Sequence, residues 1–215
     1  MRLGLFGGTF NPIHNGHLRA GVEIREAFDL DRVLYLPAAV PPHKEVGGLL
    51  PFADRLKMVR LAVAGQRPLQ ASAAEQKNPG KSYSIRTVQY FHRAFPRGVE
   101  LFFIIGLDAF LEIPSWKEYR KLFTLCHFIV LDRPGYNRRH LADFLYREIS
   151  PDFQSFPRQG RYLHPGGYAV FVKRVTRLEI SSTFIRRLRR EGRSVRFLIP
   201  EAVEKYMLKK GFYGE

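Results

Sequence analysis

The segment Gly7–His17, with the sequence GGTFNPIHNGH, constrains the fold of this chain more than any other stretch. It follows a short apolar run, Leu3–Phe6, that predicts a buried strand, and it leads into Leu18 and Val22, whose spacing predicts a helix. The segment is therefore a strand-to-helix loop. Two glycines let backbone N–H groups approach a ligand closely, and the start of a helix directs unpaired N–H groups at the same place. This arrangement suits a phosphate group.

His14 and His17 lie three residues apart at the expected start of the helix. On one helical turn they would offer two side-chain donors that face the same way. Two alternatives stay open on the residues alone. The glycine pair could be an ordinary tight turn, and the two histidines could bind a metal with His43 as a third ligand. No Asp or Glu stands beside the histidines as in zinc-hydrolase motifs, so we favour the phosphate site.

A second segment, Ile180–Arg186, carries three consecutive hydroxyl residues before an arginine. Hydroxyl residues at this position are typical of helix caps, and they could have no other role. Together with the arginine they would also offer a second cradle for an anion.

The two segments resemble the signatures G-G-x-F-x-P-x-H-x-G-H and I-S-S-T-x-I-R of the nucleotidyltransferase superfamily, whose members transfer AMP or CMP onto a phosphate. The resemblance implies a doubly wound parallel sheet, Rossmann-like, and a site for ATP. It assigns catalysis to His14, His17 and Arg186. It assigns ATP binding to Gly7, Gly8, Thr9, Phe10, His14, His17, Ile180, Ser181, Thr183 and Arg186.

Further blocks are similar to segments of bacterial nicotinate-nucleotide adenylyltransferases. They are LPAAVPPHK (36–44), SYSIRT (82–87), GLDAF with PSW (106–116) and DRPGY (132–136). The resemblance implies nicotinate mononucleotide as the acceptor, bound by Lys44, Tyr83, Thr87, Asp108, Trp116 and Arg133, with Thr87 a donor to its carboxylate. Taken singly, Lys44 is typical of an exposed loop and Trp116 of a packed core. Arg86 stands where the family usually has an acidic residue.

The remaining periodicity predicts alternating strands and helices. Strands are expected at Val33–Leu36, Pro68–Ser72, Val99–Gly106, Cys126–Leu131 and Tyr168–Val172, and helices at Phe52–Ala64, 82–95 with a hydroxyl cap, 138–149 and Pro200–Lys210. Residues 75–81 are expected to form a polar loop and residues 150–167 an irregular insertion. In such a sheet ligands bind at the carboxyl ends of the strands.

At 215 residues we expect one nucleotidyltransferase domain, 1–215, whose part from about 181 to 215 is basic and helical. Of the net charge of +15, a balance of +8 lies between residues 173 and 210. A nucleic-acid binder would explain such charge, but no nucleic-acid-binding motif accompanies it, so we favour a solvated surface. The single cysteine, Cys126, lies in an apolar run and is expected to be a buried, unreactive thiol.

The sequence has no secretory leader and no membrane-spanning run, which predicts a cytoplasmic protein without a membrane partner. Whether the chain forms a homo-oligomer stays open. The resemblance implies Mg²⁺ as a cofactor carried by the ATP phosphates. A phosphate acceptor is already anionic at neutral pH, so no general base is expected.

Overall fold

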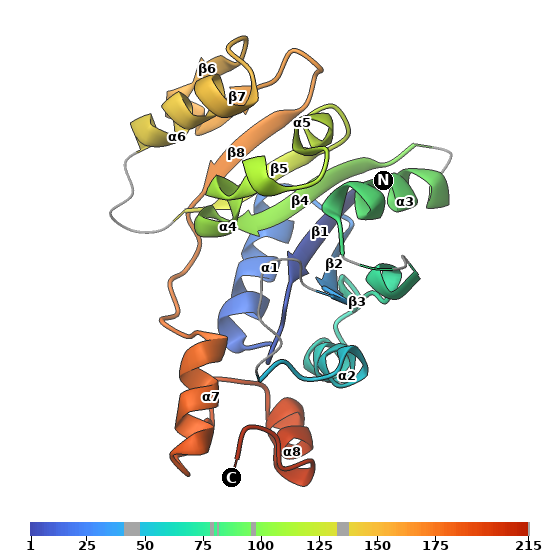
Figure 1. The fold of residues 1–215 in the computed structure, drawn as a ribbon, viewed down its shortest axis with the longest axis vertical. Helices are drawn as coiled ribbons and strands as arrows, with labels where there is room; N and C mark the ends of the chain where they lie inside the picture. The colour runs from blue at the N-terminus through green and yellow to red at the C-terminus, as the bar shows by residue number, and fades with distance from the viewer. Residues whose placement is uncertain (41–47, 78–79, 81, 96–97, 133–137, 215) are drawn as a thin grey trace.

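The computed structural model of the protein describes residues 1–40, 48–77, 80, 82–95, 98–132 and 138–214. Within these ranges the chain forms an eight-stranded sheet, in the order β3-β2-β1-β4-β5-β8-β7-β6, with helices on both faces (Figure 1). The strands are β1 (Arg2–Gly8), β2 (Arg32–Pro37), β3 (Leu69–Ala71), β4 (Glu100–Gly106), β5 (His127–Leu131), β6 (Gln154–Phe156), β7 (Arg161–Leu163) and β8 (Ala169–Lys173).

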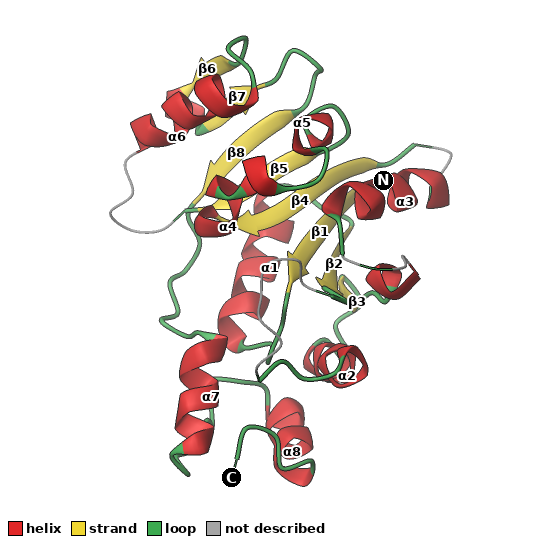
Figure 2. Cartoon of the chain, in the orientation of Figure 1, coloured by secondary structure: helices red, strands yellow, loops and turns green. Residues whose placement is uncertain are grey.

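The helices alternate with the strands along most of the chain (Figure 2). They are α1 (Asn15–Ala27), α2 (Phe52–Ala62), α3 (Ser84–Ala94), α4 (Leu107–Leu111), α5 (Tyr119–Leu122), α6 (Arg138–Phe144), α7 (Ser182–Arg190) and α8 (Glu201–Lys209), with short turns η1 (Ala74–Lys77), η2 (Ile113–Ser115), η3 (Leu145–Ile149) and η4 (Pro157–Gln159). All the strands and helices expected from periodicity are present, with ends shifted by a few residues. In the described part of the chain, no helix combines the length and the apolar character needed to span a membrane.

The sheet is parallel from β3 to β8 and antiparallel over its last two strands. From β1 the chain moves outward to β2 and β3, then returns to β4 on the opposite side of β1 and continues to β5. The strand order therefore reverses between β1 and β4, which confirms the doubly wound arrangement. The carboxyl ends of these two strands border the crevice in which such sheets bind ligands.

Each face of the sheet has its own apolar core. Along β4, Leu101, Phe103 and Ile105 pack with α3 to α6, whereas Phe102 and Ile104 pack with α1, α2, α7 and α8. All five side chains are at most 5% exposed. This double burial explains why β4 is a continuous apolar run instead of an alternating one.

The prediction that residues 150–167 form an irregular insertion is wrong. They hold the antiparallel pair β6 and β7, and β7 continues the sheet beside β8. Gly160, with φ 58°, lies just before β7 in a left-handed conformation that suits glycine. Each of the two strands has only three residues, which is too short for an alternating pattern to stand out in the sequence.

Two local predictions beside α3 are also wrong. Glu75 lies in η1 and is 7% exposed, so this part of the expected polar loop is buried. Helix α3 has Tyr83 at its cap position and no side-chain cap. The hydroxyl of Ser82 instead accepts the backbone N–H groups of Ala39 (2.8 Å) and Val40 (3.2 Å). The Ser82 hydroxyl, which the local pattern predicted to cap the helix, is therefore used in a tertiary contact with the segment after β2.

Candidate active site

The loop after β1 is compact because its aromatic side chain folds into the core. Phe10 adopts φ 47°, in the left-handed region, and its ring packs edge-on against Phe6 and His17 with centroids 6.1 and 5.0 Å away. A Cβ atom on Gly8 would lie 2.9 Å from the Phe10 ring, so this position needs glycine. Phe10 therefore shapes the loop from the inside and lines neither of the cavities described next.

The two histidines meet at the start of α1, as their spacing predicted. The backbone N–H of His14 donates to Nδ1 of His17 (3.2 Å), and the two rings stack with centroids 3.6 Å apart and planes at 26°. Because Nδ1 of His17 accepts a hydrogen bond, the ring hydrogen of neutral His17 lies on Nε2. Two positive charges at this separation would repel strongly, so we expect at most one imidazolium in the pair.

His14 is the buried member of the pair, at 6% exposed. Burial lowers the pKa of His14 from 6.5 to about 4, which makes the ring neutral at neutral pH. Its Nδ1 atom is buried and has no hydrogen-bond partner among the described residues. A buried ring nitrogen without a partner is costly, and a bound ligand or an ordered water would relieve that cost.

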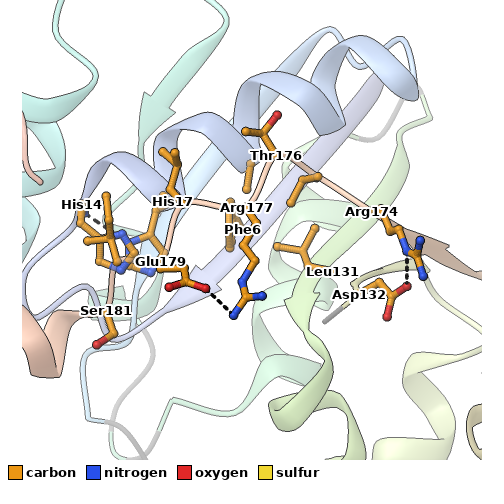
Figure 3. A pocket seen from close by; sticks show the side chains of 15 residues that line it. Phe6, His14, His17, Leu131, Asp132, Arg174, Thr176, Arg177, Glu179 and Ser181 are labelled. Atoms are coloured by element: carbon orange, nitrogen blue, oxygen red, sulfur yellow. Dashed lines mark hydrogen bonds and ion pairs between the residues drawn. The ribbon is translucent and has the colours of Figure 1, made fainter. Parts of the chain in front are cut away.

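A first cavity, of about 710 Å³, lies beside the histidine pair (Figure 3). Its walls come from the end of β5, the start of α1 and the segment between β8 and α7. The ionisable and hydroxyl residues that line it are His14, His17, Asp132, Arg174, Thr176, Arg177, Glu179 and Ser181. Both carboxylates are paired with arginines: Asp132 with Arg174 (3.2 Å) and Glu179 with Arg177 (2.7 Å). The cavity can therefore accept an anion without facing an unpaired negative charge.

A second cavity, of about 470 Å³, borders the same loop from the other face of the sheet. Gly7, Gly8 and Thr9 line it, together with Phe103 and Ile105 from the opposite core. The loop thus borders one cavity with its first residues and the other with its histidines. The segment predicted to bind a ligand therefore borders both cavities. Gly7, Gly8 and Thr9, which were predicted to bind ATP with the histidines, line the second cavity and not the first.

Two of the predicted acceptor-binding residues, Tyr83 and Trp116, line the second cavity. Trp116 is half-buried and packs edge-on against Phe103, with ring centroids 6.0 Å apart. Above the Tyr83 ring lie the Lys117 ammonium at 5.2 Å and the Arg86 guanidinium at 5.3 Å from the centroid. The arginine at the position that is usually acidic therefore makes a cation–π contact with a cavity residue.

Thr87 and Asp108 line neither cavity. Thr87 is 1% exposed, and its hydroxyl donates to Oε1 of Glu75. We expected this hydroxyl to donate to the carboxylate of the ligand. In the structure it donates to the buried side chain of Glu75 instead. Burial raises the pKa of Glu75, while hydrogen bonds from Thr87 and Ser82 act in the opposite direction. Asp108 lies exposed in the first turn of α4.

The second signature forms both a helix cap and a cavity wall. The hydroxyl of Ser181 accepts the backbone N–H of Phe184 (3.1 Å) at the start of α7, and Ile180 and Ser181 line the first cavity. Arg186 donates to the carbonyl of Asn11 (2.8 Å) and to the hydroxyl of Thr183 (3.2 Å). Three of its five N–H groups have no described partner, and neither Arg186 nor Thr183 is part of the cavity lining.

Lys44 and Arg133, predicted to bind the acceptor, lie outside the described residues, as does His43. Where the structure describes the chain, no group of three His, Cys, Asp or Glu side chains is placed to hold a metal ion.

Arg55 of α2 was missed by the sequence analysis. It is fully buried, and its guanidinium donates to three backbone carbonyls: Thr9 (2.8 Å), Leu50 (2.9 Å) and Ala39 (3.2 Å). Burial lowers the pKa of Arg55, while the neighbouring Tyr213 acts in the opposite direction. Its signal in the sequence is its position three residues before Met58 and four before Val59, which places an arginine on the apolar stripe of the helix.

Comparison with known protein families gives a match over most of the chain. The cytidylyltransferase-like family matches residues 5–188. Proteins named probable nicotinate-nucleotide adenylyltransferase from Geotalea uraniireducens and Geobacter sulfurreducens are each 46% identical, and each alignment covers 100% of this chain and 99% of the relative.

Solved structures support the same fold. The nicotinic acid mononucleotide adenylyltransferase of Plasmodium falciparum, complexed with NaAD, superposes with a TM-score of 0.74 at 17% identity, over 99% of this chain and 97% of that one. A putative nicotinate-nucleotide adenylyltransferase from Vibrio parahaemolyticus gives 0.61 at 18% identity, over 99% and 94% of the two chains. At these identities the likeness concerns the fold alone.

Proposed function

The chain belongs to the cytidylyltransferase-like family and, within it, to the nicotinate-nucleotide adenylyltransferases, and from this premise we propose how its two cavities share the reaction. The enzyme transfers the AMP group of ATP to nicotinate mononucleotide and releases pyrophosphate. The other product is deamido-NAD, so the reaction is a step of NAD biosynthesis. The observation that carries the proposal is that one loop, Gly7–His17, borders both cavities.

We assign ATP to the first cavity. Its phosphates would lie against His14, His17 and Ser181, where the described carboxylates are already paired with arginines. Ile180 would contact the nucleoside, and Arg186 would reach the phosphates with the N–H groups it does not use on Asn11 and Thr183. Thr183 would act by orienting that guanidinium.

We assign nicotinate mononucleotide to the second cavity. Trp116 and Tyr83 offer aromatic faces for the pyridine ring, and Lys117 adds a cation. The start of α3, which has no side-chain cap, offers backbone N–H groups to the carboxylate in place of the Thr87 hydroxyl. Gly7, Gly8 and Thr9 would border the acceptor phosphate. Roles for Lys44, Asp108 and Arg133 stay predictions from the family resemblance.

The chemistry then needs no proton acceptor. An oxygen of the acceptor phosphate forms a bond to the α-phosphorus of ATP, while the bond from that phosphorus to the bridging β-phosphate oxygen breaks and pyrophosphate leaves. The chain supplies positioning and donors for the developing charge. Nε2–H of His17 is such a donor, because His14 fixes the tautomer through Nδ1. The unpartnered Nδ1 of His14 would gain a partner when the site is filled.

We infer that Mg²⁺ enters with ATP, on the phosphate oxygens. Asp132 and Glu179, the carboxylates of the first cavity, are occupied by arginines, and the phosphate end offers imidazoles. Such a donor set suits a metal that keeps its waters and binds through the substrate. When bound, the ion would neutralise charge on the phosphates.

The test is a steady-state assay of pyrophosphate release with ATP, Mg²⁺ and either nicotinate or nicotinamide mononucleotide. We expect turnover with the acid and a kcat/KM for the amide that is lower by about 10²- to 10⁴-fold, because the amide NH₂ would face donors and leave them unpaired. Phosphopantetheine and glycerol phosphate serve as control acceptors. Turnover only with a control acceptor, or a ratio near one, would contradict the assignment of the second cavity.

A further inference from the structure

The loop between the two cavities is held in place by side chains from distant parts of the chain. The carbonyl of Thr9 accepts from Arg55 of α2 (2.8 Å), and that of Pro12 accepts from Ser182 of α7 (2.8 Å). Because these two carbonyls are fixed by hydrogen bonds, the peptide planes of the loop cannot turn freely. The direction of its N–H groups thus depends on contacts made from outside the loop.

Asn11 makes more of the hydrogen bonds that hold the loop than any other residue that the structure describes. It is 6% exposed, and its carbonyl accepts from Arg186 (2.8 Å). Its side-chain amide donates to the carbonyl of Gly48 (2.9 Å), and its Oδ1 accepts from the N–H of Leu50 (3.2 Å). Asn11 lies in the sequence between Thr9, in the wall of the second cavity, and His14, in the wall of the first. A rotation of Asn11 would therefore change both walls.

The last contact on Asn11 comes from the C-terminal segment. The hydroxyl of Tyr213 donates to Oδ1 of Asn11 over 2.5 Å, across 202 positions of sequence. Tyr213 adopts φ 60°, a left-handed conformation that costs energy for a residue other than glycine. Burial raises the pKa of Tyr213, so the hydroxyl keeps its proton and remains a donor.

Tyr206, seven residues earlier, provides a natural comparison. Its hydroxyl donates to Oδ1 of Asp54 in α2 (2.7 Å), so it also ties the C-terminal part to the body of the protein. Unlike the bond from Tyr213, this hydrogen bond does not end on the loop between the cavities. Loss of either hydroxyl removes one tertiary hydrogen bond, to an amide oxygen for Tyr213 and to a carboxylate oxygen for Tyr206.

We propose that Tyr213 is a positioning residue for adenylyl transfer, which holds Asn11, and through it the loop between the two cavities, in the conformation that the reaction needs. The proposal rests on the assignment of that loop to the reacting phosphates. A small displacement of the loop would misalign the acceptor oxygen and the α-phosphorus, and such misplacement reduces rate more than it reduces binding.

The experiment compares Tyr213→Phe with Tyr206→Phe in the full chain. We expect Tyr213→Phe to lower kcat by about tenfold or more with KM for nicotinate mononucleotide within about twofold, and Tyr206→Phe to keep kcat within about twofold of the original protein. The two variants should lose similar thermal stability, since each loses one hydrogen bond. A lower kcat in Tyr213→Phe alone, with a similar loss of stability in both variants, would distinguish a positioning role from general structural support.

A double-mutant cycle with Asn11→Ser tests the route. If Tyr213 acts through Asn11, the double variant should be no slower than Asn11→Ser alone. Equal kcat values for Tyr213→Phe and Tyr206→Phe, or additive effects in the cycle, would overturn the proposal. An unmodified protein that releases no pyrophosphate would instead contradict the proposed function, so the two failures are distinguishable.

Discussion

At the scale of single residues, the stacked pair His14 and His17 carries the proposed charge stabilisation. We predict that His17→Ala lowers kcat by about 30- to 10³-fold, which corresponds to roughly 2 to 4 kcal/mol, because a donor to the phosphates is lost while the fold persists. His140→Ala is the matched control, since His140 is exposed on α6 and lines neither cavity. Pyrophosphate release measured for both variants checks the prediction, and near-normal turnover by His17→Ala would contradict it.

His14 should also make stability depend on pH. Its pKa is lowered to about 4 in the folded protein, below the unfolded value of 6.5, so folding favours the neutral ring. The stability it contributes is complete above pH 6.5 and is lost as the pH falls toward 4. The whole change is up to about 3 kcal/mol in the free energy of unfolding.

Urea unfolding of the original protein and of His14→Gln, between pH 6.5 and 4, measures this contribution. The pKa values of His127 and His164 are lowered by burial as well, but both residues remain in both proteins. The difference between the two pH profiles therefore reports His14 together with its coupling to the stacked His17, and we expect a flatter profile for the glutamine variant. Parallel profiles would show that the pKa of His14 is the same in the folded and the unfolded protein, and would contradict the prediction.

At the scale of elements, the close packing of α1 against β2 depends on one glycine. A Cβ atom on Gly21 would lie 1.9 Å from the hydroxyl oxygen of Tyr35, and that hydroxyl donates to the carbonyl of His17 (3.2 Å). The helix that carries the histidine pair can approach the sheet this closely only without a side chain at position 21. Close approach, and not a turn, explains a glycine in the middle of a helix.

We predict that Gly21→Ala lowers the free energy of unfolding by about 1–3 kcal/mol, although alanine favours helices, because the overlap must displace α1 or Tyr35. Turnover should fall as well, since His17 lies on the same helix. Tyr35→Phe removes the atom that would be 1.9 Å away and leaves Cζ at 2.9 Å, so the double variant should recover part of the stability. Denaturant midpoints of the single and double variants provide the check. A Gly21→Ala variant that is as stable as the original protein would contradict this account.

At the scale of the whole molecule, the positive charge lies largely on solvated surface. Arg187 pairs with Glu191 (3.8 Å) and Lys205 with Glu201 (2.6 Å), and all four side chains are between 44% and 74% exposed. Exposed charges of this kind are screened over about 8 Å at physiological ionic strength. The excess charge of the C-terminal part therefore agrees with the solvated face expected from the sequence, while Tyr213 in the same part contacts the loop between the two cavities.

The elements could be predicted from the sequence to the extent that their residues repeat with a clear period. The apolar run of β4 and the strand-to-helix loop after β1 are long or distinctive enough to be recognised locally. The pair β6 and β7 could not be predicted, because each strand has only three residues, which is too short for an alternating pattern to be recognised. The contact of Ser82 could not be predicted either, because its hydroxyl bonds the segment after β2 and not its own helix.

The sequence by itself determined the chemistry that is available: a glycine pair, two histidines on one helical turn, and a hydroxyl-rich helix start with an arginine. These signals are local, because each depends on residues that are neighbours in the chain. Only the tertiary structure decided that the loop divides its residues between two cavities, that Thr87 serves Glu75, and that Arg55 and Tyr213 hold the loop. These contacts join positions from 12 to 202 residues apart, and no local pattern encodes which distant donor meets which acceptor.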